Sequence, residues 1–156
     1  LNSVGKCEIN MKNNSLYEQD FSEWALHNAA LLRAGKLNEI DTANIAEELE
    51  SLGKQDKRAL MSRAILLLMH LLKWQFQAER RSKSWELTIK EQRKQILRLC
   101  KDSPSLKKWL SEQSLEEIYL DALEDAVDET GLDEKIFPKN CPYSLAQILD
   151  KAYYPE

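Results

Sequence analysis

Apolar residues recur at helical spacing along most of the chain, and no segment alternates apolar and polar residues as a half-buried strand does. The first predicted helix covers about residues 20–34 and is stopped by Gly35. The second begins near Asp41 or Thr42 and ends at Gly53. Each has one apolar face, made by Phe21, Trp24, Ala25, Leu31 and Leu32 in the first helix and by Ile45, Leu49 and Leu52 in the second.

The third predicted helix, from about Lys54 or Gln55 to Gln77, contains the longest apolar stretch of the chain. Its apolar side chains form two adjacent rows, Leu60–Ala64–Leu67–Leu71 and Met61–Ile65–Leu68–Leu72. A helix that is apolar over so much of its surface belongs at the centre of a bundle.

A polar connection over residues 78–84 leads into a fourth helix that has two contrasting faces. The inward face holds Trp85, Ile89, Ile96 and Leu99. The outer face is basic and holds Lys90, Lys94, Arg98 and Lys101.

Ser103 and Pro104 predict the start of a fifth helix, because serine caps helix starts and proline is favoured at the first helical position. A sixth helix covers about residues 114–130 and is stopped by Gly131, and a short helix follows over about residues 144–151. The sixth helix turns Leu115, Ile118, Tyr119, Ala122 and Ala126 inward, and its opposite face carries Glu117, Asp121, Glu124 and Asp128.

These elements predict an all-α fold, a single compact helical bundle of about six to seven helices with a long central apolar helix. We expect residues 1–15 to be a disordered or upstream lead, since residues 1–10 are polar, aperiodic and precede Met11. Residues 16–156 are expected to form a single all-helical domain.

The composition agrees with this class, because 4 Gly and 4 Pro are too few for the many tight turns of a sandwich or barrel. The 3 cysteines, Cys7, Cys100 and Cys141, are widely spaced, form no metal-binding pair and favour a reducing, cytoplasmic location. No apolar stretch is long enough to span a bilayer, and we expect no membrane association.

Charge is segregated along the chain although the net charge is only −4. Residues 1–53 carry 4 Lys and Arg against 9 Asp and Glu, residues 54–101 carry 13 against 4, and residues 102–156 carry 5 against 13. A basic middle therefore lies between two acidic flanks.

The basic middle interleaves cations with aromatic residues, a pattern that suits phosphate contacts and base stacking. The acidic pI of about 5.4 argues against a nucleic-acid partner, and the acidic sixth helix would neutralise the basic fourth helix if the two packed together. Internal charge pairing or a protein-binding face is therefore ranked above nucleic acid. The candidate residues are Lys73, Trp74, Arg80, Arg81, Lys83, Lys90, Lys94 and Arg98.

Glu47, Glu50 and His70 form a second, weaker candidate as a polar cluster for metal-dependent or hydrolytic chemistry. Carboxylate metal sites in bundles use Glu-x-x-His pairs, which this chain lacks. The favoured interpretation is a solvated acidic face and a boundary histidine bonded to a neighbouring helix. No catalytic residue, metal or cofactor is predicted.

Several segments together resemble the family known as domain of unknown function 29, which is bacterial and especially abundant in cyanobacteria. The segments are Leu16–Phe21, Leu32–Gly35, Glu47–Gly53, Leu68–Trp74, Arg80–Ser82 with Trp85, Asp102–Leu106, Thr130–Leu132 and Cys141–Tyr143. The resemblance implies a compact, all-helical, intracellular protein. It carries no established activity, cofactor or catalytic residue.

The leading functional hypothesis is a non-enzymatic cytoplasmic module for protein–protein contact, with an unknown protein partner or a homo-oligomer. Nucleic-acid binding through residues 73–101 is the alternative, and an enzyme that uses Glu47, Glu50 and His70 is the third hypothesis.

Overall fold

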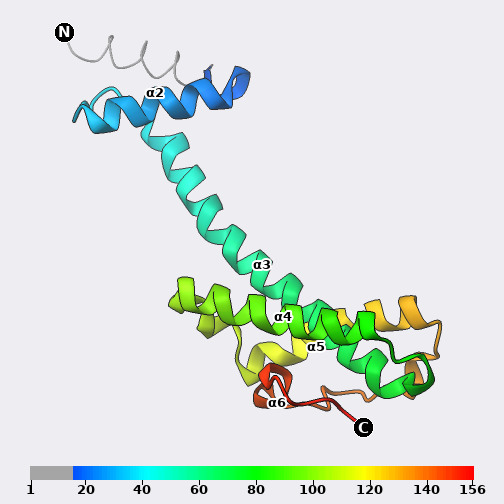
Figure 1. The fold of residues 1–156 in the computed structure, drawn as a ribbon. Helices are drawn as coiled ribbons and strands as arrows, with labels where there is room; N and C mark the ends of the chain where they lie inside the picture. Colours follow the sequence, from blue (N-terminus) through cyan, green and yellow to red (C-terminus); the bar gives the residue numbers. More distant parts are fainter. Residues whose placement is uncertain (1–15) are drawn as a thin grey trace. The chain divides into compact units, whose positions relative to one another are not determined.

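The computed structural model describes residues 16–156, and this part of the chain is helical with no strand. The all-α class predicted from the sequence is confirmed (Figure 1). The expectation for residues 1–15 lies outside the described residues. The described residues divide into two compact units, one that ends at Gly53 and one over Lys54–Glu156.

The first unit contains α2, Phe21–Arg33, close to its predicted bounds. The Asp20 carboxylate caps the helix by accepting a hydrogen bond from the backbone N–H of Glu23 at 3.0 Å. Gly35 follows the end of the helix with a φ of 69°, a left-handed conformation that favours glycine.

A buried polar network joins α2 to the start of the next helix in the first unit. The Trp24 indole N–H donates to Asp41 at 3.0 Å, and the backbone N–H of Asp41 donates to the Asn28 side chain at 2.8 Å. Asp41 also accepts from the backbone N–H of Asn44 at 3.3 Å, which caps the following helix. The buried face of α2 is thus Trp24, Asn28 and Leu31, and the predicted face members Phe21 and Leu32 are exposed at its edge.

The next helix, α3, runs without interruption from Thr42 to Phe76. The predicted break at Gly53 is wrong, because Gly53 has a helical conformation and a glycine inside a helix costs only about 1 kcal/mol relative to alanine. The predicted apolar face of the first part is also wrong, since Leu49 and Leu52 are 63% and 60% exposed.

The second unit has its core on the part of α3 that the sequence marked as most apolar. Leu60, Leu67, Leu71 and Leu72 are fully buried and Leu68 is nearly so, while the row members Met61 and Ile65 pack at the edge. The prediction of a wide apolar face on this stretch of helix is confirmed.

Two further helices pack on α3 in the second unit (Figure 1). The first is α4, Lys83–Asp102, which follows the short 3₁₀ helix η1, Ala78–Arg80, and is capped by Ser82. The second is α5, Glu112–Thr130, which begins with a capping box and ends at left-handed Gly131. All the residues that the sequence placed inward on α5 are buried.

The predicted fifth helix is instead a 3₁₀ helix, η2, over Pro104–Trp109. Ser103 does not cap it, because its hydroxyl donates to Asp56 at 3.3 Å. The segment is held by the buried Leu106 and by Lys57, whose ammonium lies 3.3 Å from the centre of the Trp109 ring.

The carboxy-terminal segment holds η3, Glu134–Ile136, and α6, Leu145–Leu149, and its end is tied to α4. The Arg93 guanidinium donates from Nε to the carbonyl of Ile148 at 2.8 Å and from Nη2 to the carbonyl of Tyr153 at 2.7 Å. These bonds fix the last residues of the chain beside α4.

Candidate interaction surfaces

The outer side of α4 carries cations together with exposed leucines. These side chains recur at intervals of about one or two helical turns, so they lie on the same side of the helix, and all of them are exposed. We call this the basic α4 surface: Lys83, Leu87, Lys90, Lys94, Leu97, Arg98 and Lys101. Leu87 is 55% and Leu97 41% exposed, so apolar area lies between the charges.

The ion pairs of the basic α4 surface are formed inside α4. Glu86 pairs with Lys83 at 2.9 Å and with Lys90, and Arg98 lies 3.8 Å from Asp102. Within residues 16–156 no ion pair joins α4 to α5. The sequence left two alternatives open for the basic fourth helix, pairing with the acidic sixth helix or an exposed basic face. The exposed cations and their ion pairs within α4 agree with the second alternative.

Lys73 does not belong to this surface, since it is buried against α5. Its ammonium forms an ion pair with Glu129 and lies 4.6 Å from the centre of the Trp85 ring. Lys73 is thus part of the interior of the second unit, and the half-buried Trp85 ring lies against its ammonium.

Trp74 and Arg81 are also used internally. Arg81 donates to the backbone carbonyls of Trp74 at 2.8 Å and Pro155 at 3.4 Å, and the Trp74 ring lies 5.0 Å from the Tyr154 ring. The aromatic rings that were candidates for base stacking are therefore packed against the protein. Arg80, in η1, is exposed.

The residues of the weaker polar cluster have different environments. Glu47 and Glu50 are exposed in the first unit, and His70 is buried in the second. Across the described range, no group of three His, Cys, Asp or Glu side chains is arranged to hold a metal ion.

His70 is bonded to its own helix. Its Nδ1–H donates to the carbonyl of Leu66 at 2.9 Å, so the predicted bond to a neighbouring helix is wrong. Burial lowers the pKa of His70 below its ordinary value of 6.5, and the charge of Lys73 also lowers it. His70 is therefore neutral at pH 7.

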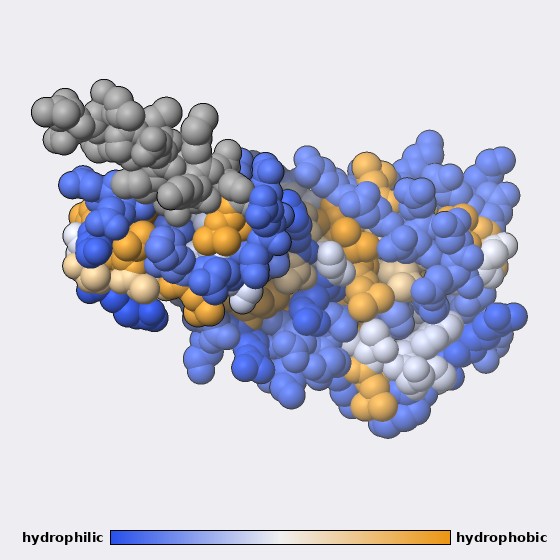
Figure 2. Space-filling model, turned by 90° about the horizontal axis from the view of Figure 1, so that it is seen from above, coloured by the Kyte–Doolittle hydropathy of each residue, from blue (hydrophilic) through white to orange (hydrophobic). Residues whose placement is uncertain are grey.

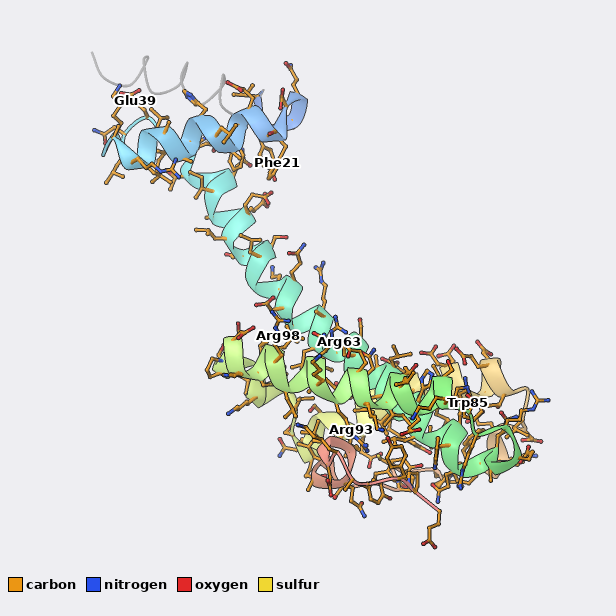
Figure 3. All side chains as sticks on the ribbon, in the orientation of Figure 1. Phe21, Glu39, Arg63, Trp85, Arg93 and Arg98 are labelled. Carbon is orange, nitrogen blue, oxygen red and sulfur yellow. The ribbon has the colours of Figure 1, made fainter. Side chains whose placement is uncertain are left out.

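Arg93 is a buried charge that the sequence reasoning did not single out. It is 1% exposed, and Figure 3 shows it on the side of α4 opposite Arg98. Arg93 lies four residues after Ile89 and three before Ile96, which puts it on the inward face of α4. This spacing is the sequence signal that indicates its burial. Within the described residues, its Nη1 and the hydroxyl of Tyr154 are buried without hydrogen-bond partners.

A groove with an acidic rim follows α5 on the second unit. We call it the acidic α5 groove, a depression of about 380 Å³ with an apolar floor of Leu120, Leu123 and Val127 and a rim of Glu124, Asp128 and Glu134. An adjoining depression of about 560 Å³ shares three of these residues and continues past Asp133, Lys135, Phe137, Pro138 and Lys139. Leu120 is 59% exposed.

Exposed apolar residues also occur in the first unit. Among the described residues of that unit the large ones are Phe21, Leu26, Leu32, Leu37, Leu49 and Leu52. Figure 2 shows apolar side chains on the visible face as separate areas between hydrophilic ones.

The chain belongs to the family described as domain of unknown function DUF29, whose model matches residues 16–154. No curated protein and no solved structure matches it. Over residues 16–156, no helix has both the length and the apolar character needed to cross a membrane.

Proposed function

We propose that this member of the DUF29 family is a non-enzymatic protein–protein interaction module that contacts its partner through the basic α4 surface. The observation that supports this most is the exposure of Leu87 and Leu97 between cations on a helix whose other side is locked into the core. Apolar anchors on a rigid helix, surrounded by charge, suit recognition of an acidic protein surface. A cytoplasmic location stays a prediction.

Two features favour a protein over nucleic acid as the partner. The half-buried rings of Trp74 and Trp85 contact Tyr154 and the ammonium of Lys73, so less of each ring is left for stacking on bases. The exposed apolar residues of the surface are leucines, which bury apolar area against another protein.

The test uses a double charge reversal, Lys94→Glu/Arg98→Glu, in the full chain. Purified wild-type and variant proteins are compared by affinity capture from the native cell, and each captured protein is then purified and titrated against both. The control Lys107→Glu/Lys151→Glu makes the same change in net charge at exposed positions outside α4. We expect a directly binding protein that the α4 variant loses and the control retains. If the α4 variant keeps every partner of the wild type, the proposal is wrong.

Nucleic-acid binding is the second candidate, favoured by the exposure of Arg80, Lys94 and Arg98 without charge compensation from α5. It predicts that fluorescence anisotropy of labelled single- and double-stranded DNA rises on addition of the protein at low salt, and that binding weakens steeply as salt increases. An unchanged anisotropy at low salt would exclude it.

A further inference from the structure

The acidic helix α5 has little charge compensation within its own unit. It contains eight acidic residues and no lysine or arginine, and all eight are exposed: Glu112, Glu116, Glu117, Asp121, Glu124, Asp125, Asp128 and Glu129. Glu129 pairs with Lys73, and Glu112 and Glu116 accept backbone N–H bonds from Leu145 and Cys141. Among the described residues, none of the other five forms an ion pair.

The acidic α5 groove adds an apolar floor to this charge. Leu120 stands exposed beside the buried Leu123 and the partly buried Val127, and the carboxylates of Glu124 and Asp128 lie along the rim. Lys135 and Lys139 line only the adjoining depression. The groove is therefore suited to a helix that carries leucines next to cations.

The basic α4 surface of this same protein has that chemistry. Lys94 and Arg98 flank Leu97 on the outer side of α4, at positions three before it and one after it. Both surfaces belong to the second unit, yet no ion pair joins them within the part of the chain that is described. The cations of the basic α4 surface and the carboxylates of the acidic α5 groove do not pair within one molecule. Their opposite charges suit pairing between two molecules.

We propose that the occupant of the acidic α5 groove is the basic α4 surface of a second copy of this chain. This rests on the proposed function, because it names the partner of the α4 surface. Leu97 and Leu87 of one copy lie against Leu120, Leu123 and Val127 of the other, and Lys94 and Arg98 meet Glu124 and Asp128.

The contact joins two different surfaces of the chain. Two copies that exchange it reciprocally form a closed, isologous dimer, whereas copies that use one contact at a time are joined heterologously and form a chain. A helix set against a shallow groove is a small interface, and its ion pairs are exposed to solvent. We therefore expect weak association that salt disrupts.

Charge reversal on each side, followed by mixing, tests the contact. The full-length variants are Lys94→Glu/Arg98→Glu in α4 and Glu124→Lys/Asp128→Lys in α5. Sedimentation equilibrium at low and high salt gives the mass of each as a function of concentration. Circular dichroism confirms that each variant keeps its helical content. Glu79→Lys/Asp125→Lys is the control, because both positions are exposed outside the groove and the charge change equals that of the α5 variant.

We expect the wild type and the control to self-associate at low salt and each reversed variant to associate about tenfold or more weakly. An equimolar mixture of the two variants recovers association, because the intact groove of one accepts the intact α4 surface of the other. A single chain with all four substitutions recovers it as well, since both sides are then reversed together.

The outcomes separate this inference from the function on which it rests. A wild type that stays monomeric at low salt, or a mixture that does not recover association, overturns the self-contact. If the α4 variant nevertheless loses a different protein, the interaction module stands and only the identity of its partner is wrong. If the α4 variant changes no binding of any kind, both proposals fail.

Discussion

Arg93 and Arg98 lie five residues apart on α4 and end in opposite environments. The Arg93 guanidinium is buried and donates to the carbonyls of Ile148 and Tyr153, whereas Arg98 is exposed and lies 3.8 Å from Asp102 on the same helix. One arginine therefore holds the carboxy-terminal segment in place, and the other is part of the surface that we propose for binding. The two roles can be separated by substitution.

Arg93→Ala is expected to lower the free energy of unfolding by about 2–4 kcal/mol, because it removes two charge-assisted bonds to carbonyls and leaves a cavity beside Tyr154. Arg98→Ala is expected to change it by about 0.5 kcal/mol or less, since its ion pair is exposed. Urea denaturation followed by circular dichroism measures both. Equal midpoints for the two variants would contradict the structural role of Arg93.

We expect unequal losses of stability when one or the other partner of the Lys73–Glu129 ion pair is removed. Lys73 is buried, while the side chain of Glu129 is half exposed. Glu129→Ala leaves a buried ammonium without its carboxylate and is expected to destabilise the fold by about 1–3 kcal/mol.

Lys73→Met is the matched comparison, because methionine keeps most of the apolar stem and leaves behind only a carboxylate that solvent can reach. We expect a loss of about 1 kcal/mol or less. Thermal and urea unfolding of both variants measure the difference. A larger loss for Lys73→Met than for Glu129→Ala would show that the ammonium itself, through Trp85, is the main source of stability.

Because His70 is buried, we expect the free energy of unfolding to depend on pH. Its pKa in the folded protein is lowered by burial, so the unfolded chain binds a proton more readily than the folded one. The favourable contribution of neutral His70 to the free energy of unfolding is fully present above about pH 6.5, the ordinary pKa of histidine. It is lost as the pH falls from there toward the lowered pKa of the folded protein.

His70→Gln removes this proton linkage without adding a charge. Unfolding free energies of the wild type and the variant, measured at closely spaced pH values, are subtracted so that the shared carboxylate contributions cancel. We expect the excess stability of the wild type over His70→Gln to shrink as the pH falls below about 6.5. A difference that stays constant from neutral to acidic pH would mean that His70 titrates equally in both states.

The sequence predicts best the elements whose apolar spacing leaves few alternatives. The two apolar rows on residues 60–72 and the inward face of α5 were both confirmed, because a wide apolar stripe has to be buried. The burial of Arg93 and Lys73 was missed, although Arg93 has an inward position. Their partners Ile148 and Glu129 are 55 and 56 residues away, and only the folded chain brings them together.

The surfaces were harder to predict than the core. The predicted cations of the outer face of α4 are all exposed, and each follows the last by three or four positions: Lys90, Lys94, Arg98 and Lys101. The sequence left open whether this face pairs with the acidic helix, because spacing along one helix does not say which face of another it meets. The acidic α5 groove also needs Glu134 from η3, whose placement no periodicity indicates.

Gly53 gives a final test of the uninterrupted α3. Glycine marks a helix end only where the backbone turns left-handed, as at Gly35 and Gly131 with φ of 69° and 68°, and Gly53 is not such a position. A methyl group added at Gly53 would meet no atom within 4 Å beyond its chain neighbours and the nearby backbone of its own helix. Gly53→Ala is therefore expected to stabilise the protein by about 0.5–1 kcal/mol, because alanine favours the helix and restricts the unfolded chain.

Gly131→Ala is the matched comparison and is expected to destabilise the protein by about 1–2 kcal/mol, because alanine is strained in the left-handed region. Thermal unfolding followed at the helical circular dichroism band measures both changes. If Gly53→Ala lowers the midpoint as Gly131→Ala does, the helix is broken at Gly53 as the sequence pattern first predicted.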